Sequence, residues 1–312
     1  MRTSAQYYED LKKMKPNIYI GGEKVGRNDP RLKPGINVMS VTFAIANDPE
    51  WDGLITATSS LIGKKINRFT HLPQNPHDLI QKQKMIRLLS QRVGGCIQRC
   101  MGMDAIIALS IATKEMDDKY GTEYHRHFMD YLKVYQDKDL TAACAQTDMK
   151  GDRIKRPSEQ ADLDAYVHVV DVRDDGIVVR GAKISITMAA YADEIIALPT
   201  RAMGEADKDY AVAFALPADW EGVHLITRPV AVRQRKAVKC PFAECGVSDS
   251  MVIFDNAFAP KERVFMCGEW EFGRRLALLF ADSHRHSYSG CKPAVSDILC
   301  GATALVAEAN NI

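Results

Sequence analysis

The chain has 312 residues, 46% of them hydrophobic, which is enough apolar material to fill one large core or two to three domains. Its 41 lysine and arginine residues nearly cancel its 40 aspartate and glutamate residues, so the charge pattern excludes a dedicated nucleic-acid or membrane-surface protein. No apolar run reaches the length of a membrane span, and the opening residues lack the pattern of a signal peptide.

This composition predicts a cytoplasmic protein whose partner is a small molecule. Eight cysteines in that compartment are expected to be reduced thiols or metal ligands rather than disulfides. Five of them are interpreted as thiols of the core or the surface: Cys144, Cys240, Cys245, Cys267 and Cys300.

The first half of the chain is predicted to be helical. A start signal at Asn75-Pro76 is followed by apolar residues at spacings of three, four and seven, which continue as far as Cys96 and Cys100. The pattern predicts that both cysteines lie on the inward face of one helix, where Gly94-Gly95 would allow a cluster or another backbone to approach closely. Further helices are expected near the start of the chain (residues 7–14) and over residues 104–119 and 123–135.

The character of the chain changes from residue 147 onward. Residues 147–153 are polar, contain a glycine and precede Pro157, a composition that suits either a cofactor loop or an ordinary solvated linker. The turn Asp174-Asp175-Gly176 then predicts a hairpin between strands 166–172 and 177–185. Helices followed by a block of antiparallel strands indicate an α+β fold. Further strands are expected over residues 195–198, 211–216, 223–227 and 251–254.

Past Pro260 the sequence becomes helical again. Two helices are predicted, over residues 269–289 and 293–310, with the break at Pro293. The chain stops at Asn311-Ile312, inside what is predicted to be a helix that needs a partner. We therefore expect the sequence to be a fragment of a longer protein.

Two cysteines and a cluster at residues 281–292 are the most informative about function. Cys96 and Cys100, together with His284 and Cys291, could form a four-ligand metal site. Three thiolates and one imidazole suit either zinc or an iron-sulfur cluster, and the spacing does not choose between them. His286 is an alternative ligand to His284.

Two further side chains lie beside this set in the sequence. Tyr288 and Lys292 could hold an acidic or oxyanionic substrate next to a metal. Each also has a structural interpretation, as a half-buried packing tyrosine and as a solvated lysine. A buried cysteine can equally serve as a small core residue.

Four stretches of the chain carry a resemblance to a known family: residues 96–104 (Cys-Ile-Gln-Arg-Cys-Met-Gly-Met-Asp), 176–183, 205–212 and 284–292. With them the sequence closely resembles the 4-hydroxybutyryl-CoA dehydratase branch of the flavin-dependent 4-hydroxyphenylacetate hydroxylase-like family, over essentially its whole length. The resemblance implies an acyl-CoA dehydrogenase-like fold. Its parts would be an N-terminal helical domain (1–143), a middle β-domain (144–267) and the beginning of a C-terminal helical bundle (268–312).

The resemblance further implies two cofactors. A [4Fe-4S] cluster would be held by Cys96, Cys100, His284 and Cys291, and FAD would lie between the cluster and the β-domain. The residues matched to the flavin-binding stretches of the family are Thr147, Asp148, Lys150, Gly151, Asp152, Arg153, Ser185 and Thr187.

The activity that the resemblance implies is radical dehydration of 4-hydroxybutyryl-CoA to crotonyl-CoA, with isomerisation of vinylacetyl-CoA, in a cytoplasmic homotetramer. That reaction must break a C–H bond at the β carbon, which the thioester carbonyl does not acidify directly, so one-electron chemistry is needed. His284 would act as ligand and base, Tyr288 would hydrogen-bond the hydroxyl or thioester oxygen, and Lys292 would stabilise the enolate.

One residue departs from the family pattern. Asp249 stands where the dehydratases have a functional glutamate, and its side chain is one methylene shorter. Two alternatives stay open, of which the first is motivated by Asp249. The first is an isomerase without dehydratase activity, or a dehydratase of a related hydroxyacyl-CoA. The second is a flavin-dependent aromatic hydroxylase-like protein or a non-catalytic metal-binding protein.

Overall fold

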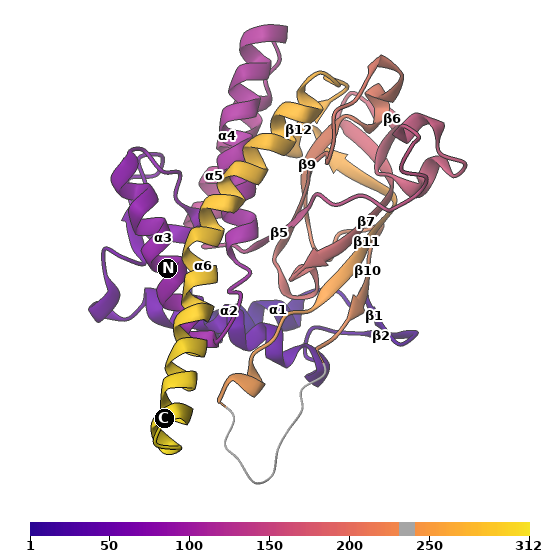
Figure 1. The fold of residues 1–312 in the computed structure, drawn as a ribbon. Helices are drawn as coiled ribbons and strands as arrows, with labels where there is room; N and C mark the ends of the chain where they lie inside the picture. The colour runs from indigo at the N-terminus through magenta and orange to yellow at the C-terminus, as the bar shows by residue number, and fades with distance from the viewer. Residues whose placement is uncertain (231–240) are drawn as a thin grey trace.

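Most helices lie on one side of the molecule and the two larger sheets on the other (Figure 1). This computed structural model describes residues 1–230 and 241–312, so the thiol expected at Cys240 falls outside the described residues. Along the chain, a mainly helical part with four short strands comes first, most of the strands follow, and a long helix comes last. The α+β fold and the helical, β, helical order expected from the sequence are confirmed.

The described residues form six α-helices: α1 (Ser4–Lys13), α2 (Lys33–Ala46), α3 (Pro76–Val93), α4 (Cys100–Tyr120), α5 (Tyr124–Asp137) and α6 (Phe272–Ala309). The predictions of α1, α4 and α5 are confirmed. The helix α2 was not predicted. Its buried residues recur at spacings of three and four, but Val41, Ala44 and Ile45 on the less buried side are apolar too, so the sequence itself shows little alternation. Within the described part of the chain, none of the helices has the length and apolar content to cross a membrane.

The larger sheet has the strand order β2-β1-β10-β11-β7-β6. The strands β6 and β7 are antiparallel and form the hairpin predicted at Asp174-Asp175-Gly176. At the other edge, β1 and β2 bring the N-terminal segment of the chain into the sheet. The bounds of these strands are β1 (Ile18–Ile20), β2 (Glu23–Val25), β6 (His168–Arg173), β7 (Gly176–Thr187), β10 (Val223–Arg228) and β11 (Asp249–Pro260).

A smaller sheet has the order β12-β9-β8-β5, and β3 and β4 form a separate hairpin. The strands of the predicted block, β6 to β11, pair antiparallel with one another, as expected. Two strands outside that block pair in parallel: β1 with β10 and β5 with β8. Both pairs join strands far apart in the sequence, and parallel pairing needs such long crossovers. The bounds are β3 (Thr56–Thr58), β4 (Lys65–Asn67), β5 (Ala142–Ala145), β8 (Glu194–Ala197), β9 (Val212–Pro217) and β12 (Val264–Cys267).

Apolar side chains pack these layers together in three hydrophobic clusters. Phe214 of the smaller sheet meets Phe254 of the larger sheet edge-to-face, with ring centroids 5.2 Å apart. Phe128 of α5 packs in the same manner on Phe265 of β12, at 5.7 Å. Such buried aromatic pairs help to hold the two sheets together and α5 against the smaller sheet.

The last helix is continuous, so the predicted break at Pro293 is wrong. Helix α6 has 38 residues and contains Pro293 in its interior. Proline cannot bond to the carbonyl four residues earlier, which here belongs to Ser289. The side-chain amide of Gln83 on α3 donates a hydrogen bond to that carbonyl oxygen at 3.3 Å. A neighbouring helix therefore satisfies the group that the proline leaves unpaired, and α6 continues past it.

The helices α6 and α3 cross closely at Gly290. A Cβ atom on Gly290 would lie 2.6 Å from the backbone oxygen of Gln83 and 3.0 Å from the Cβ of Ile86. We expect Gly290→Ala to lower the free energy of unfolding by about 1–3 kcal/mol, because the two helices must separate. Denaturant titration measures the change.

A second glycine of the same helix provides the control for this prediction. Gly301 is exposed, and a Cβ atom there would have no neighbour within 4 Å. Gly301→Ala should therefore raise the stability by about 0.5–1 kcal/mol, since alanine is the better helix former. If the two substitutions gave the same change, the close crossing of α3 and α6 would be contradicted.

Candidate metal and cofactor site

A cavity of about 210 Å³ lies where the segment before α4, the end of β7 and the middle of α6 meet. Three of the four predicted metal ligands line it: Cys96, His284 and Cys291. The structure therefore brings predicted site residues from two distant segments to one place. The remaining lining residues are Met101, Thr187, Tyr288, Lys292 and Val295.

The two thiols of the first segment lie close together, but not for the predicted reason. Helix α3 ends at Val93, where Gly94 adopts the left-handed conformation (φ 69°) that commonly caps a helix. Cys96 therefore lies in the connection between two helices, and Cys100 is the first residue of α4. The prediction of a single helix carrying both cysteines is wrong. So is the inward orientation of Cys96, because Cys100 is buried and Cys96 is exposed.

Gln98 bends the connection between the two thiols. Its backbone has a φ of 62°, a left-handed conformation that costs a residue with a side chain about 1–2 kcal/mol. Its buried side chain accepts a hydrogen bond from the hydroxyl of Tyr191 and donates one to the carbonyl oxygen of Gly246 at 3.0 Å. These contacts hold the turn that brings the sulfurs of Cys96 and Cys100 within hydrogen-bonding distance.

The hydrogen bond between the two sulfurs makes their acidities differ. It lowers the pKa of Cys96 to about 6, with help from the nearby charges of His284 and Lys292. The same hydrogen bond, together with burial, raises the pKa of Cys100 well above its usual value. Cys96 is therefore the first of the two thiols to ionise, and a thiolate is the form that binds metals.

In the metal-free protein, Cys96 is expected to react with iodoacetamide along a pH profile centred near its pKa of about 6. Peptide mass spectrometry after timed alkylation, from mildly acidic to mildly alkaline pH, measures the profile. The variant Cys100→Ala should move it toward the ordinary thiol value of about 8.5, because it removes the hydrogen-bond donor. A wild-type profile already centred there would contradict the sulfur–sulfur contact.

His284 is held by a carboxylate that the sequence analysis did not identify. Its Nδ1 atom lies 2.8 Å from Oδ2 of Asp104, which is fully buried on α4. Ligand atoms of Cys100, Asp104 and His284 all lie within 4.8 Å of one another. The sequence did contain a signal for this carboxylate, because Asp104 is a charged residue at the end of the 96–104 motif, directly before an apolar stretch. His286, the alternative ligand, does not line the cavity.

The pKa of Asp104 is set by opposing effects. Burial raises it, but the hydrogen bond with His284 and the charge of Lys82 outweigh burial and hold the pKa below the usual value. Lys82 of α3 reaches the carboxylate with an Nζ–Oδ1 distance of 2.6 Å and is itself almost completely buried. A buried ion pair therefore lies directly behind the histidine.

The predicted site residues of α6 share one face of the helix. The ring centroids of His284 and Tyr288 are 4.5 Å apart. The Nζ atom of Lys292 lies 5.0 Å from the centre of the Tyr288 ring. Tyr288 remains 43% exposed, so its packing leaves the phenol accessible. An imidazole, a phenol and an ammonium therefore line the cavity along two turns of one helix.

Thr187 and Asp249 meet at the edge of this cavity. They are paired residues of β7 and β11, and the Thr187 hydroxyl donates a hydrogen bond to Oδ1 of Asp249 at 2.8 Å. The other carboxylate oxygen of Asp249 lies 3.2 Å from the guanidinium of the exposed Arg228. Ser185, two residues before Thr187, has a positive φ of 57°.

The other predicted cofactor stretch, residues 147–153, runs beside β7. The backbone N–H of Ile184 on β7 donates to the carbonyl oxygen of Thr147 at 2.9 Å. Oδ1 of Asp148 lies 2.5 Å from Nζ of Lys183, with both side chains nearly buried. The next residues turn outward into solvent and do not line the 210 Å³ cavity: Lys150, Gly151, Asp152 and Arg153.

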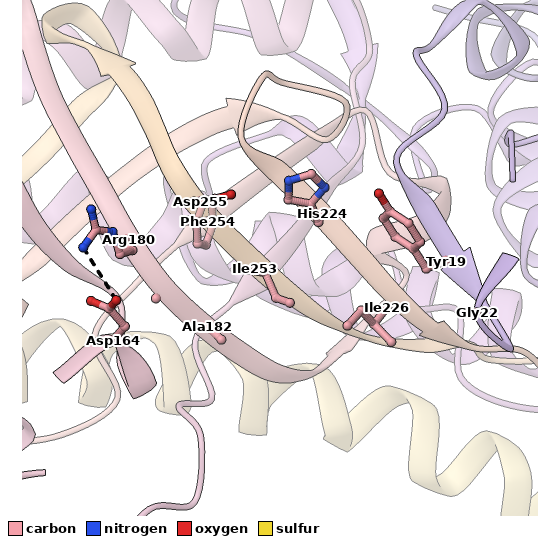
Figure 2. A pocket seen from close by; sticks show the side chains of 11 residues that line it. Tyr19, Gly22, Asp164, Arg180, Ala182, His224, Ile226, Ile253, Phe254 and Asp255 are labelled. Atoms are coloured by element: carbon pink, nitrogen blue, oxygen red, sulfur yellow. Dashed lines mark ion pairs between the residues drawn. The ribbon is translucent and has the colours of Figure 1, made fainter. Parts of the chain in front are cut away.

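A larger depression on the six-stranded sheet has a different chemistry. It has a volume of about 690 Å³ and is lined by Tyr19, His224 and apolar side chains (Figure 2). Asp164 and Arg180 face each other at its rim, 3.6 Å apart. None of its lining residues is a cysteine, so the thiol-lined cavity remains the candidate for a metal.

Comparison with known proteins identifies the family. A family profile described as "4-hydroxyphenylacetate 3-hydroxylase N terminal" matches residues 3–266. The chain belongs to the 4-hydroxyphenylacetate 3-hydroxylase family. The resemblance inferred from the motifs is therefore confirmed.

Two relatives and two solved structures illustrate how members of this hydroxylase family resemble the chain. The 4-hydroxybutyryl-CoA dehydratase/vinylacetyl-CoA-Δ-isomerase of Clostridium aminobutyricum is 44% identical over 99% of the chain. The 4-hydroxyphenylacetate 3-monooxygenase oxygenase component of Thermus thermophilus is 30% identical over 98% of the chain. An archaeal 4-hydroxybutyryl-CoA dehydratase from N. maritimus, described as oxygen tolerant, superimposes with a TM-score of 0.92 at 38% identity over 98% of the chain. An FAD-complexed 4-hydroxyphenylacetate 3-monooxygenase superimposes at 0.83, with 27% identity over 99% of the chain.

The chain spans only part of each of these family members. It covers 65% of the Clostridium protein, 64% of the Thermus protein, 62% of the archaeal structure and 64% of the FAD-complexed structure. Activities that belong to the whole of those proteins are therefore treated as proposals.

Proposed function

We propose that the protein dehydrates 4-hydroxybutyryl-CoA to crotonyl-CoA and isomerises vinylacetyl-CoA, using FAD and a [4Fe-4S] cluster. The observation that carries the proposal is the convergence of Cys96, His284 and Cys291 on one cavity, with Cys100 directly behind Cys96. The 44% identity to a protein of that activity supports the same substrate class.

The residues at the cavity fit an iron-sulfur cluster. Cys96, Cys100, Cys291 and His284 are the proposed ligands, and sulfur with imidazole nitrogen is a donor set that clusters use. The lowered pKa of Cys96 provides a thiolate at neutral pH. When bound, the cluster would supply a Lewis-acidic iron for the leaving hydroxyl, and FAD would supply one-electron transfer.

The exposed residues 150–153, beside β7, suit the diphosphate of FAD. Lys150 and Arg153 are exposed, and neither has a carboxylate partner among the described residues. Two such cations next to the strand that carries Ser185 and Thr187 suit a dianionic group. We assign FAD binding to this stretch and to these two β7 residues, together with Thr147, Asp148, Gly151 and Asp152.

The face of α6 supplies the proposed acid–base groups. The Tyr288 phenol would donate a hydrogen bond to the thioester or hydroxyl oxygen, and the Lys292 ammonium would stabilise negative charge on the enolate. His284 would accept the proton that the substrate loses only when its Nε2 is released from the metal, because its Nδ1 is bonded to Asp104. Asp249 would keep the Thr187 hydroxyl oriented at the edge of the cavity, as its hydrogen bond at 2.8 Å does now.

A second candidate function is isomerisation alone, or dehydration of a related hydroxyacyl-CoA. The observation that favours it is the position of Asp249, where both carboxylate oxygens are already engaged by Thr187 and Arg228. A shorter carboxylate held in this way reaches less far into the cavity than a glutamate would.

Anaerobic purification followed by cofactor analysis tests the proposal. We expect iron, acid-labile sulfide and FAD, and conversion of both 4-hydroxybutyryl-CoA and vinylacetyl-CoA. Conversion of vinylacetyl-CoA alone would favour the second candidate. Stoichiometric zinc without flavin would reject both and would indicate a non-catalytic metal-binding protein.

A further inference from the structure

We propose that Asp104 is a positioning residue that fixes the ring tautomer of His284, so that Nδ1 carries the proton and Nε2 carries the lone pair available to a metal. The inference rests on the proposed function in one respect, the assignment of His284 as a metal ligand. It adds a buried unit behind that ligand, formed by Asp104 and Lys82.

The contacts of the Asp104 carboxylate carry the proposal. Its Oδ1 accepts from Lys82 Nζ at 2.6 Å and from the hydroxyls of Ser283 and Ser287, each at 3.0 Å. Its Oδ2 lies 2.8 Å from His284 Nδ1 and accepts from the Ser287 hydroxyl at 3.0 Å. Three helices, α3, α4 and α6, thus contribute to one buried network around a single carboxylate.

The charge state of this network determines which ring nitrogen is protonated. An ionised carboxylate only accepts hydrogen bonds, so the Nδ1 atom facing it must donate. The adjacent ammonium of Lys82, 2.6 Å away, keeps Asp104 ionised. In neutral histidine only one nitrogen carries a proton, so Nε2 is left with its lone pair. A carboxylate on the second nitrogen of a histidine ligand also increases the basicity of the ligand.

Asp104 is better suited to this role than to direct metal binding. The geometry alone would allow a ligand, since its oxygen lies within 4.8 Å of the Cys100 and His284 ligand atoms. Every side of the carboxylate already has a donor, however, and binding a metal would require the release of Lys82 or His284. Leaving the buried Lys82 without its partner would be strongly unfavourable.

Two measurements on the metal-free protein test the proposal. Two-bond proton–nitrogen NMR of protein labelled with nitrogen-15 histidine reports the tautomer, and His284→Ala identifies the signal. Titration with cobalt(II) alone, followed by its thiolate charge-transfer absorption, reports affinity. We expect the wild-type ring protonated at Nδ1, and cobalt affinity lower by about 10–100-fold in Asp104→Asn.

Two variants test whether the effects of Asp104→Asn come only from damage to the fold. Lys82→Met/Asp104→Asn removes both buried charges together, so the protein should stay folded. It no longer has the ionised carboxylate that fixes the tautomer of His284. Glu194→Gln breaks another ion pair with a buried carboxylate, which lies 2.8 Å from the partly exposed Arg263, far along the chain from the cavity residues. The double variant should show a mixed tautomer and weakened cobalt binding, and Glu194→Gln should show neither.

The outcomes separate this inference from the proposed function. If His284→Ala weakens cobalt binding but the Asp104 variants bind like wild type, Asp104 does not position the ligand and the inference is wrong. A wild-type ring protonated at Nε2 would overturn it as well. If His284→Ala leaves cobalt binding unchanged, the ligand assignment within the proposed function fails, and the inference fails with it.

Discussion

Under the proposed function, replacing Cys100 with alanine is expected to remove iron from the protein and to reduce dehydration of 4-hydroxybutyryl-CoA below detection. Cys100 is buried behind Cys96, and its thiol hydrogen-bonds to the Cys96 sulfur. The substitution therefore removes one proposed ligand and, through the lost hydrogen bond, the acidity of a second. Iron and sulfide analysis after anaerobic purification, together with the coupled assay of crotonyl-CoA formation, measures the loss.

Cys144→Ala is the matched control for this variant. Cys144 lies on β5 and is 2% exposed, comparable with 3% for Cys100, but it is not one of the proposed ligands. Both substitutions remove one buried sulfur from the interior, so both should cost similar stability. Only Cys100→Ala should lose iron. Retention of a full complement of iron by Cys100→Ala would contradict the ligand set, whereas iron loss in both variants would point to general damage.

The residue types of the candidate site could be predicted from the sequence, but the local structure around them could not. Thiols, an imidazole and a phenol are rare and chemically specific, so Cys96, His284 and Tyr288 could be singled out without coordinates. Helix ends depend on competing signals. The apolar periodicity favoured a helix through Cys96, yet the left-handed Gly94 ends it.

Features that arise from tertiary contacts were beyond the sequence analysis. The continuity of α6 depends on Gln83 of another helix bonding to the carbonyl that Pro293 leaves unpaired. The parallel pairing of β5 with β8 depends on how distant segments meet. Asp104 and Lys82 come from different helices with ordinary helical sequence, and only their burial side by side shows that they act together.

Lys82→Met is expected to lower the free energy of unfolding by about 3–5 kcal/mol. Lys82 is 1% exposed and neutralises the fully buried Asp104. The substitution keeps much of the length of the side chain but leaves a carboxylate without its counter-ion in a low-dielectric interior. Its remaining donors, His284 and two serine hydroxyls, do not carry the permanent charge of an ammonium. Urea denaturation with circular dichroism measures the change.

Lys84→Met provides the control on the same helix. Lys84 is exposed, and no carboxylate partner is found for it among the described residues, so the same substitution there should change stability by no more than about 0.5 kcal/mol. Equal effects at the two positions would contradict the buried ion pair as the source of the difference.

The pH dependence of the Lys82→Met effect follows from the lowered pKa of Asp104. A carboxyl whose pKa is lower in the folded state stabilises the fold above its unfolded value of about 3.9, and this stabilisation is lost as the pH falls through the folded value. Lys82 contributes to that lowering, so the difference in stability between wild type and Lys82→Met should be complete at neutral pH and should shrink in acid. A difference that stayed constant into acid would mean that the lost stability comes from packing rather than from charge.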